Sequence, residues 1–256
     1  SPDWKLGSSF SRYFALQTTQ IQDQDQASFS DEEIDYPMST VSGGVDFAVK
    51  PTERLAVYSG VYFARRNGVV GDVTLKFHGT PSAGAVNQNT RISSTTLPEI
   101  NIQLEDQTMD RLIDLKERSE NVPSYGRIAN SAYYKFGLNL DQQYDYVEVP
   151  AGVSFKLIDK KMEVNAIAGV SASILVNQQA RLYDDEQVYW KDQVKGLSKY
   201  LYHTRLGVNI DFPVYKALSF YVQPTYRRDL NSIYKDIPQP SHPDRLAVFA
   251  GINVDL

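Results

Sequence analysis

Three histidines are the side chains best suited to catalysis in this chain, because the sequence contains no cysteine. A histidine can activate a serine nucleophile only when the two lie within hydrogen-bond reach. His78 and His242 fall in stretches interpreted as loops, and His203 lacks the His-x-Ser arrangement of lipid A deacylases. We therefore predict no catalytic residue, and we expect His203 to make a structural hydrogen bond.

Acidic residues gather in two stretches that could offer oxygen ligands to a divalent cation. The first stretch contains no Lys or Arg and consists of Asp23, Asp25, Asp31, Glu32, Glu33 and Asp35. The second stretch is Asp184-Asp185-Glu186. Neither stretch has the ligand spacing and central glycine of a calcium loop, so we predict two solvated acidic loops, with no metal site and no cofactor.

Composition excludes two classes of protein. The formal net charge of -5 and the pI near 5.3 argue against a nucleic-acid partner, which requires a basic surface to neutralise phosphates. The mean hydropathy is -0.38, and no apolar run is long enough for a membrane-spanning helix. Aromatic residues make up 12% of the chain, which favours strands because flat, stiff side chains suit a pleated surface.

Eight segments alternate apolar and polar residues with a period of two, which is the pattern of a strand with two different faces. In the clearest of them, Val164, Val170 and Ile174 share one face, while Glu163 and Asn165 lie on the other. The predicted strands are residues 4–16, 38–50, 55–66, 144–157, 162–176, 200–212, 218–228 and 245–255.

The connections between these segments alternate in length. Short turns are expected at residues 51–54, 158–161 and 213–217, and long loops at 17–37, 67–143, 177–199 and 229–244. This layout predicts an all-β fold, an eight-stranded antiparallel up-and-down transmembrane β-barrel with long loops at one end. Residues 1–256 would form one domain, with a large loop insertion at about 67–143. Within the insertion we expect a helix at 108–118 and strand extensions at 73–77 and 133–140.

The less apolar face decides between a membrane barrel and a soluble, lipocalin-like ligand-binding barrel. This face is rich in Gly, Ser and Asn, and it carries Asp46, Glu148, Arg205 and Arg227. Small residues and opposite charges suit the narrow, side-chain-filled lumen of an eight-stranded membrane barrel. Because an isolated buried charge is costly, we predict that Glu148 forms an ion pair with Arg205 or Arg227.

Aromatic residues at the strand ends are consistent with girdles at the two membrane interfaces. The chain would then contact outer-membrane lipid, in a Gram-negative bacterium. The predicted interfacial aromatics are Trp4, Tyr200, Tyr202, Phe212, Phe220 and Tyr226.

Short motifs along the strands resemble the outer-membrane β-barrel domains of Bacteroidetes. They include Trp4-Lys5-Leu6-Gly7, Ser42-Gly43-Gly44-Val45, Tyr146-Val147-Glu148-Val149-Pro150, Gln223-Pro224-Thr225-Tyr226-Arg227 and Phe249-Ala250-Gly251-Ile252. Many members of that family are C-terminal parts of longer proteins, and some resemble anti-sigma factors that span both membranes. The resemblance implies an anchor or sensor. The start at Ser1, directly before a strand pattern, agrees with a mature protein or an excised C-terminal domain.

Together these observations predict a non-enzymatic outer-membrane barrel that acts as an envelope anchor, a sensor or a surface-interaction module. We expect a monomer whose long loops contact an envelope or extracellular protein or a glycan. The alternatives are an outer-membrane lipid-modifying enzyme and the soluble ligand-binding barrel.

Overall fold

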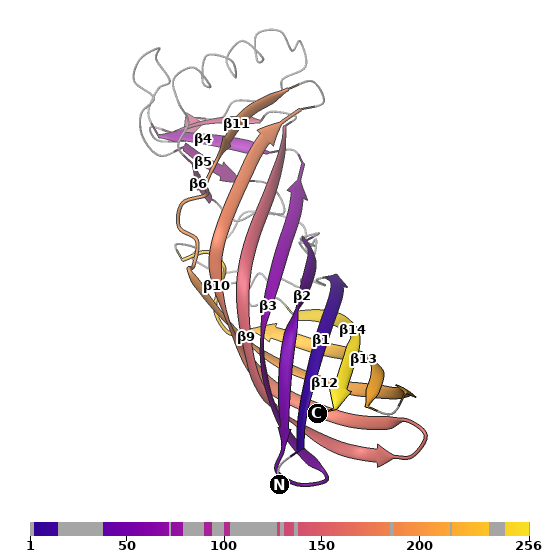
Figure 1. The fold of residues 1–256 in the computed structure, drawn as a ribbon. Coiled ribbons are helices and arrows are strands. Elements are labelled where there is room, and N and C mark those ends of the chain that lie inside the picture. Colours follow the sequence, from indigo (N-terminus) through magenta and orange to yellow (C-terminus); the bar gives the residue numbers. More distant parts are fainter. Residues whose placement is uncertain are drawn as a thin grey trace, which may run out of the picture.

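A computed structural model gives the fold of the chain (Figure 1). It describes residues 3–14, 38–71, 73–78, 90–93, 100–102, 127–128, 131–135, 138–184, 187–215, 217–235 and 244–255. The acidic stretch from Asp23 to Asp35, the expected helix at 108–118 and His242 lie outside these residues. Among the described residues, no helix is long and apolar enough to cross a membrane.

Eight antiparallel strands close into a barrel, which confirms the predicted fold class. The ring closes because β1 pairs with both β2 and β14, and β9 pairs with both β3 and β10. The barrel strands are β1 (Asp3–Phe14), β2 (Met38–Lys50), β3 (Leu55–Val70), β9 (Asn139–Asp159), β10 (Glu163–Tyr183), β12 (Tyr200–Tyr215), β13 (Leu218–Asp229) and β14 (Asp244–Asp255).

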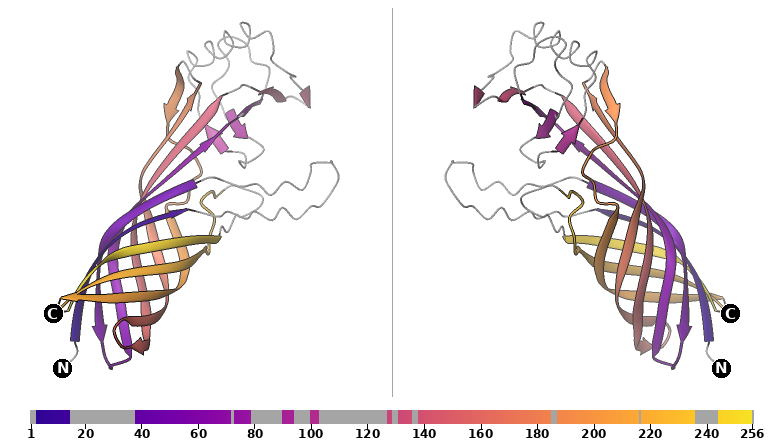
Figure 2. Two further views of the ribbon diagram at one scale, coloured as in Figure 1. Left: turned by 90° about the vertical axis from the view of Figure 1, so that its right-hand side faces the viewer. Right: turned by 90° about the vertical axis from the view of Figure 1, so that its left-hand side faces the viewer.

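Short turns join β2 to β3, β9 to β10 and β12 to β13 at one end of the barrel, and both termini lie at that end (Figures 1 and 2). In outer-membrane barrels the short turns face the periplasm, and the long loops face the exterior of the cell. We name the end with the short turns the periplasmic end and the opposite end the outer end, after this layout.

Within the barrel, the apolar face points outward on the strands whose side chains are described, as the composition of the less apolar face predicts. Val61, Val153 and Leu206 are about half exposed on the exterior, whereas their neighbours in the chain face the lumen. Two glycines make room for the Tyr58 side chain, which extends from β3 over the neighbouring strands β9 and β10: a Cβ atom at Gly152 or Gly169 would collide with the Tyr58 hydroxyl. An apolar exterior around a tightly filled interior is the reverse of a soluble barrel.

Three barrel strands continue beyond the outer end of their neighbours and form a distal wall (Figure 2). We use this name for residues 138–146 of β9 and its approach, residues 175–183 of β10, the end of β3 and the added strand β11 (Val188–Asp192). A bulge between Leu175 and Asn177 shifts the β9–β10 register where the wall begins.

The distal wall has the opposite pattern from the barrel, with its apolar side chains on the inner side. Leu138, Leu140, Leu182 and Trp190 are buried in one cluster, whereas Arg181 is exposed. The wall therefore packs like a sheet of a soluble protein. The predicted strands at 144–157 and 162–176 are too short at this end because the alternation changes phase there.

A separate five-stranded sheet comes from the large insertion. Its strands pair in the order β6 (Ile100–Ile102), β5 (Thr90–Ser93), β4 (Thr74–His78), β8 (Ser131–Lys135) and β7 (Arg127–Ile128). The expected extensions at 73–77 and 133–140 thus pair mainly with each other, as β4 with β8, rather than continuing β3 and β9 without a break. That residues 1–256 form a single domain stays a prediction.

Candidate functional site

Three arginines lie side by side on the lumen face of three neighbouring strands. Arg205 on β12 stands opposite Arg227 on β13, which in turn stands opposite Arg245 on β14. All three side chains are buried. Like charges directly opposite each other in a ladder repel, so this row requires acidic partners from elsewhere in the barrel.

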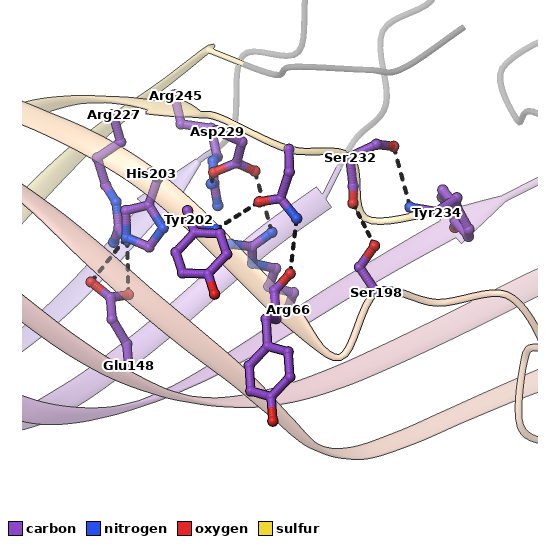
Figure 3. A network of polar contacts seen from close by, with 12 residues as sticks. Arg66, Glu148, Ser198, Tyr202, His203, Arg227, Asp229, Ser232, Tyr234 and Arg245 are labelled. Atoms are coloured by element: carbon purple, nitrogen blue, oxygen red, sulfur yellow. Dashed lines mark hydrogen bonds and ion pairs between the residues drawn. The ribbon is translucent and has the colours of Figure 1, made fainter. Parts of the chain in front are cut away.

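Glu148 supplies the first of these partners from β9. The Oε2 atom of this carboxylate lies 2.8 Å from Arg227 Nη2, and Oε1 lies 3.1 Å from His203 Nε2 (Figure 3). His203 also contacts the Arg227 guanidinium. Since all three groups are buried, this ion pair lies in the lumen away from bulk water. Of the two partners considered for Glu148, the structure places Arg227 in contact.

Asp229 supplies the second acidic partner, two residues along β13 from Arg227. Its carboxylate forms ion pairs with Arg245 and, at 3.7 Å, with Nη1 of Arg66 on β3 (Figure 3). The Arg66 guanidinium also lies 5.0 Å from the centre of the Tyr146 ring. Two carboxylates therefore hold three arginines in this layer of the lumen.

Arg205 differs from Arg66, Arg227 and Arg245 in its contacts. Its guanidinium lies 5.6 Å from the ring centre of Tyr58 and 5.2 Å from that of Phe249, which are cation–π distances. Its Nε atom is buried without a hydrogen-bond partner, and no carboxylate of the described residues forms an ion pair with it. Arg205 thus contacts aromatic rings directly, whereas the charge of Glu148 acts on it only through space.

The periplasmic half of the lumen contains a cavity of about 100 Å³. Arg205, Tyr58 and Tyr62 line its inner part, and Lys50 and Arg54 line it near the first short turn. Asp46, one of the predicted lumen charges, accepts a hydrogen bond of 2.5 Å from the Tyr62 hydroxyl.

Another lining group, Asp211, accepts hydrogen bonds from three asparagine side chains. These donors are Asn165 on β10, Asn209 on the same strand β12, and Asn253 on β14. Neutral amides thus surround this carboxylate on several sides.

The outer end of the lumen is closed by two segments that pair with each other. Leu197 forms an isolated antiparallel bridge with Tyr234, and the Ser198 amide donates to the Ile233 carbonyl at 2.7 Å. The Ser198 hydroxyl adds a bond to the Ser232 carbonyl at 2.8 Å (Figure 3). The buried cluster of the distal wall lies against these segments, with Leu197 as a member. The lumen is therefore filled by side chains above the charged layer.

A polar group on the exterior marks the outer limit of the apolar surface. Arg65 Nε donates to Asp145 Oδ1 at 2.7 Å, and Asn177 donates to Oδ2 at 3.1 Å. Burial raises the pKa of Asp145, but the hydrogen bonds from Arg65 and Asn177 outweigh it, so that the pKa lies below its ordinary value of 3.8. Below this group, Phe63 and Val147 continue the apolar exterior.

The predicted interfacial aromatics lie on the exterior wherever their side chains are described. Phe212 and Phe220 stack with ring centres 6.5 Å apart near the periplasmic end, and Tyr200, Tyr202 and Tyr226 lie toward the outer end. The side chain of Trp4 is outside the described residues.

Several residues of the lumen cluster were missed by sequence reasoning. Asp229 lies one residue past the predicted seventh strand, and Arg66 and Arg245 occupy the last and first positions of theirs. Their place on the polar face was the available signal. Alternation specifies the register least at strand ends, so the polar-face position of these residues did not predict that they belong to the lumen cluster.

A closed barrel with an apolar exterior and a lumen filled by charged and aromatic side chains defines an outer-membrane β-barrel protein. Its exterior contacts membrane lipid, and the chain is a protein of the bacterial outer membrane. The closed ring of strands and the outward-facing apolar side chains establish this class.

Comparisons with known proteins agree with this class without adding to it. No family model matches the chain, and no curated protein matches it. Similar solved structures include a major outer membrane protein from Thermus thermophilus, with 12% identity, a TM-score of 0.44 and full coverage of both chains. AlkL has 9% identity and a TM-score of 0.38, over 100% of this chain and 90% of that chain. Ail of Yersinia pestis has 9% identity and a TM-score of 0.30, over 98% and 97%. Values this low carry no inference about function.

Proposed function

We propose that this protein is a non-enzymatic outer-membrane anchor that displays a rigid platform outside the cell. The distal wall is the observation that supports this role. Leu138, Leu140 and Leu182 are almost fully buried in the wall although it stands beyond the apolar exterior. A wall with its own packed core holds a surface at a fixed height, where it can contact an extracellular protein or a glycan.

The closed lumen supports anchoring rather than transport. Ion pairs fill the middle of the barrel, and the paired segments around Leu197 and Tyr234 fill its outer end. We expect no porin-sized currents when the purified protein is inserted into planar lipid bilayers. Stable large currents would refute a filled lumen.

Labelling of intact cells tests the display of the wall, and the absence of native cysteine makes the experiment clean. Lys191→Cys places a thiol on the exposed face of β11, and Lys160→Cys places a matched thiol in the exposed turn after β9. A membrane-impermeant maleimide should label Lys191→Cys on intact cells and Lys160→Cys only after the outer membrane is permeabilised. Labelling of Lys160→Cys alone on intact cells would reverse the orientation and overturn the proposal.

The burial of His203, the histidine whose side chain the structure describes, supports a non-enzymatic role. Ser171 stands opposite His203 in the β10–β12 ladder, yet both are buried in the lumen, where Glu148 and Arg227 occupy the His203 Nε2 atom. A lipid substrate would approach the exterior surface of the barrel, and neither Ser171 nor His203 is exposed on that surface. Mass spectrometry of lipid A from expressing cells should show no change. A modification lost on His203→Ala would establish the enzyme instead.

A role as the C-terminal part of a longer signalling protein follows only from the resemblance to Bacteroidetes barrels. In that case the platform would sense an external ligand and the barrel would transmit the signal. Sequencing the full-length gene product tests this version, because it predicts an additional N-terminal cytoplasmic segment and an inner-membrane helix.

A further inference from the structure

The inner end of the periplasmic cavity combines a buried cation with a polar donor that has no partner. Arg205 is 3% exposed, and its Nε atom has no hydrogen-bond acceptor. The Tyr58 hydroxyl beside it is also buried without a partner. Both residues line the cavity.

Arg205 makes no direct ion pair with a carboxylate of the described residues, and the charge of Glu148 acts on it only through space. Arginine does not release its proton in proteins, so Arg205 stays charged in the lumen. A buried charge without a direct counter-charge is costly, and two cation–π contacts offset only part of that cost. Glu148 and Asp229 are both engaged with other arginines. A bound anion would place a negative charge in direct contact with the Arg205 guanidinium.

The geometry points to a binding site for a small carboxylate at the inner end of this cavity, with the Arg205 guanidinium as its principal ligand. The Cζ atom of the guanidinium lies over the rings of Tyr58 and Phe249, and the Nε–H group has no acceptor. A planar carboxylate accepts two parallel hydrogen bonds from a guanidinium. A cavity of about 100 Å³ suits a ligand with a few heavy atoms beyond the carboxylate.

The other charges of the cavity favour a monoanion over a phosphate dianion. Asp46, Glu163 and Asp211 also line the cavity and repel a doubly charged ligand more strongly than a singly charged one. Lys50 and Arg54, near the periplasmic mouth, attract an anion toward the entrance. The ligand class is therefore a small monocarboxylate that enters from the periplasmic side.

Nuclear magnetic resonance on the refolded full chain in detergent tests the site with acetate as the probe. Acetate should shift the side-chain Nε resonance of Arg205 in a saturable manner. Acetamide, which has the same shape without the charge, should leave it unchanged, and inorganic phosphate should bind more weakly. An unchanged Arg205 resonance, or equal effects of acetate and acetamide, would overturn the proposal without the need for a variant.

Variants then assign the binding to Arg205. Arg205→Met should weaken acetate binding at least tenfold, and Arg205→Lys should weaken it less, because it keeps the charge and loses the planar fork. Arg181→Gln is the matched control, since it removes an exposed arginine of the distal wall that pairs with Asp141. Should Arg205→Met fail to fold, the wild-type comparison of acetate with acetamide still decides the question. Equal binding by folded Arg205→Met and wild type would show that the acetate lies elsewhere.

Discussion

Replacing Glu148 by glutamine removes one charge from the lumen and keeps the shape of the side chain. At 2.8 Å from Arg227, the lost attraction is about 6 kcal/mol at an effective dielectric constant of about 20. Part of this is offset because the glutamate no longer has to be desolvated. Breaking a buried pair on one side typically costs about 3–5 kcal/mol, because the remaining charge has no counterpart. Glu148→Gln should therefore raise the unfolding equilibrium constant by roughly two to three and a half orders of magnitude.

Reversible urea unfolding in lipid vesicles, followed by circular dichroism and by the gel shift of the folded barrel, measures this cost. Glu148→Gln/Arg227→Met removes both charges, so the double variant should be more stable than Glu148→Gln alone. Glu53→Gln, an exposed carboxylate in the first short turn, is the control and should stay within about 0.5 kcal/mol of wild type. A Glu148→Gln variant as stable as this control, or strictly additive effects in the double variant, would refute the argument that the pair carries the lumen charge.

Three further predictions test the exterior, the distal wall and the polar rim. Val61→Arg, within the apolar exterior, should cost about 2–4 kcal/mol in vesicle unfolding, whereas Val69→Arg on the distal wall should cost less than about 1 kcal/mol. Equal costs would mean that the membrane border is misplaced. Leu182→Ala should cost about 2–5 kcal/mol of the local stability of the distal wall. The wall should then become sensitive to protease while the barrel keeps its gel shift. Loss of the gel shift together with protease resistance would show that the wall and the barrel unfold as one cooperative unit. Because the pKa of Asp145 is depressed, its bond with Arg65 should stabilise the protein above the unfolded-state pKa and lose that effect as the pH falls through the folded-state pKa. Asp145→Asn should remove this component of the pH-dependent unfolding curve, and an unchanged curve would contradict the assignment.

The alternation of residues predicted the barrel well because the membrane imposes one rule on every spanning strand. The predicted strand at 38–50 matches β2, and the predicted strand at 200–212 ends three residues before β12 does. Each exterior position must be apolar to contact lipid, and each lumen position must be small or paired to fit. Because the exterior and lumen positions have opposite requirements, the alternation between them is visible in a single sequence.

The distal wall could not be predicted in the same way because the rule reverses at the membrane border. At Leu140 the inward-facing residue is apolar, and at Asp141 the outward-facing residue is charged, whereas in the barrel the inward face carries Glu148. The bulge between Leu175 and Asn177 places Val176 and Asn177 next to each other in the strand without alternation. In the sequence, this phase change in the hydrophobic pattern has the same form as the end of a strand. The hydrogen-bonded ladder nevertheless continues to Tyr183.

The state of Arg205 was beyond sequence reasoning for a related reason. Glu148 could have paired with Arg205 or Arg227, since alternation places all three on the lumen face without giving the stagger between β9, β12 and β13. The closed ring fixes that stagger and brings Arg227 to the carboxylate. Arg205 then faces the aromatic rings at the inner end of the cavity. The choice of partner for one acid thus determines which arginine of the row is left to bind an anion, and a barrel with a shifted register would place that site on a different strand.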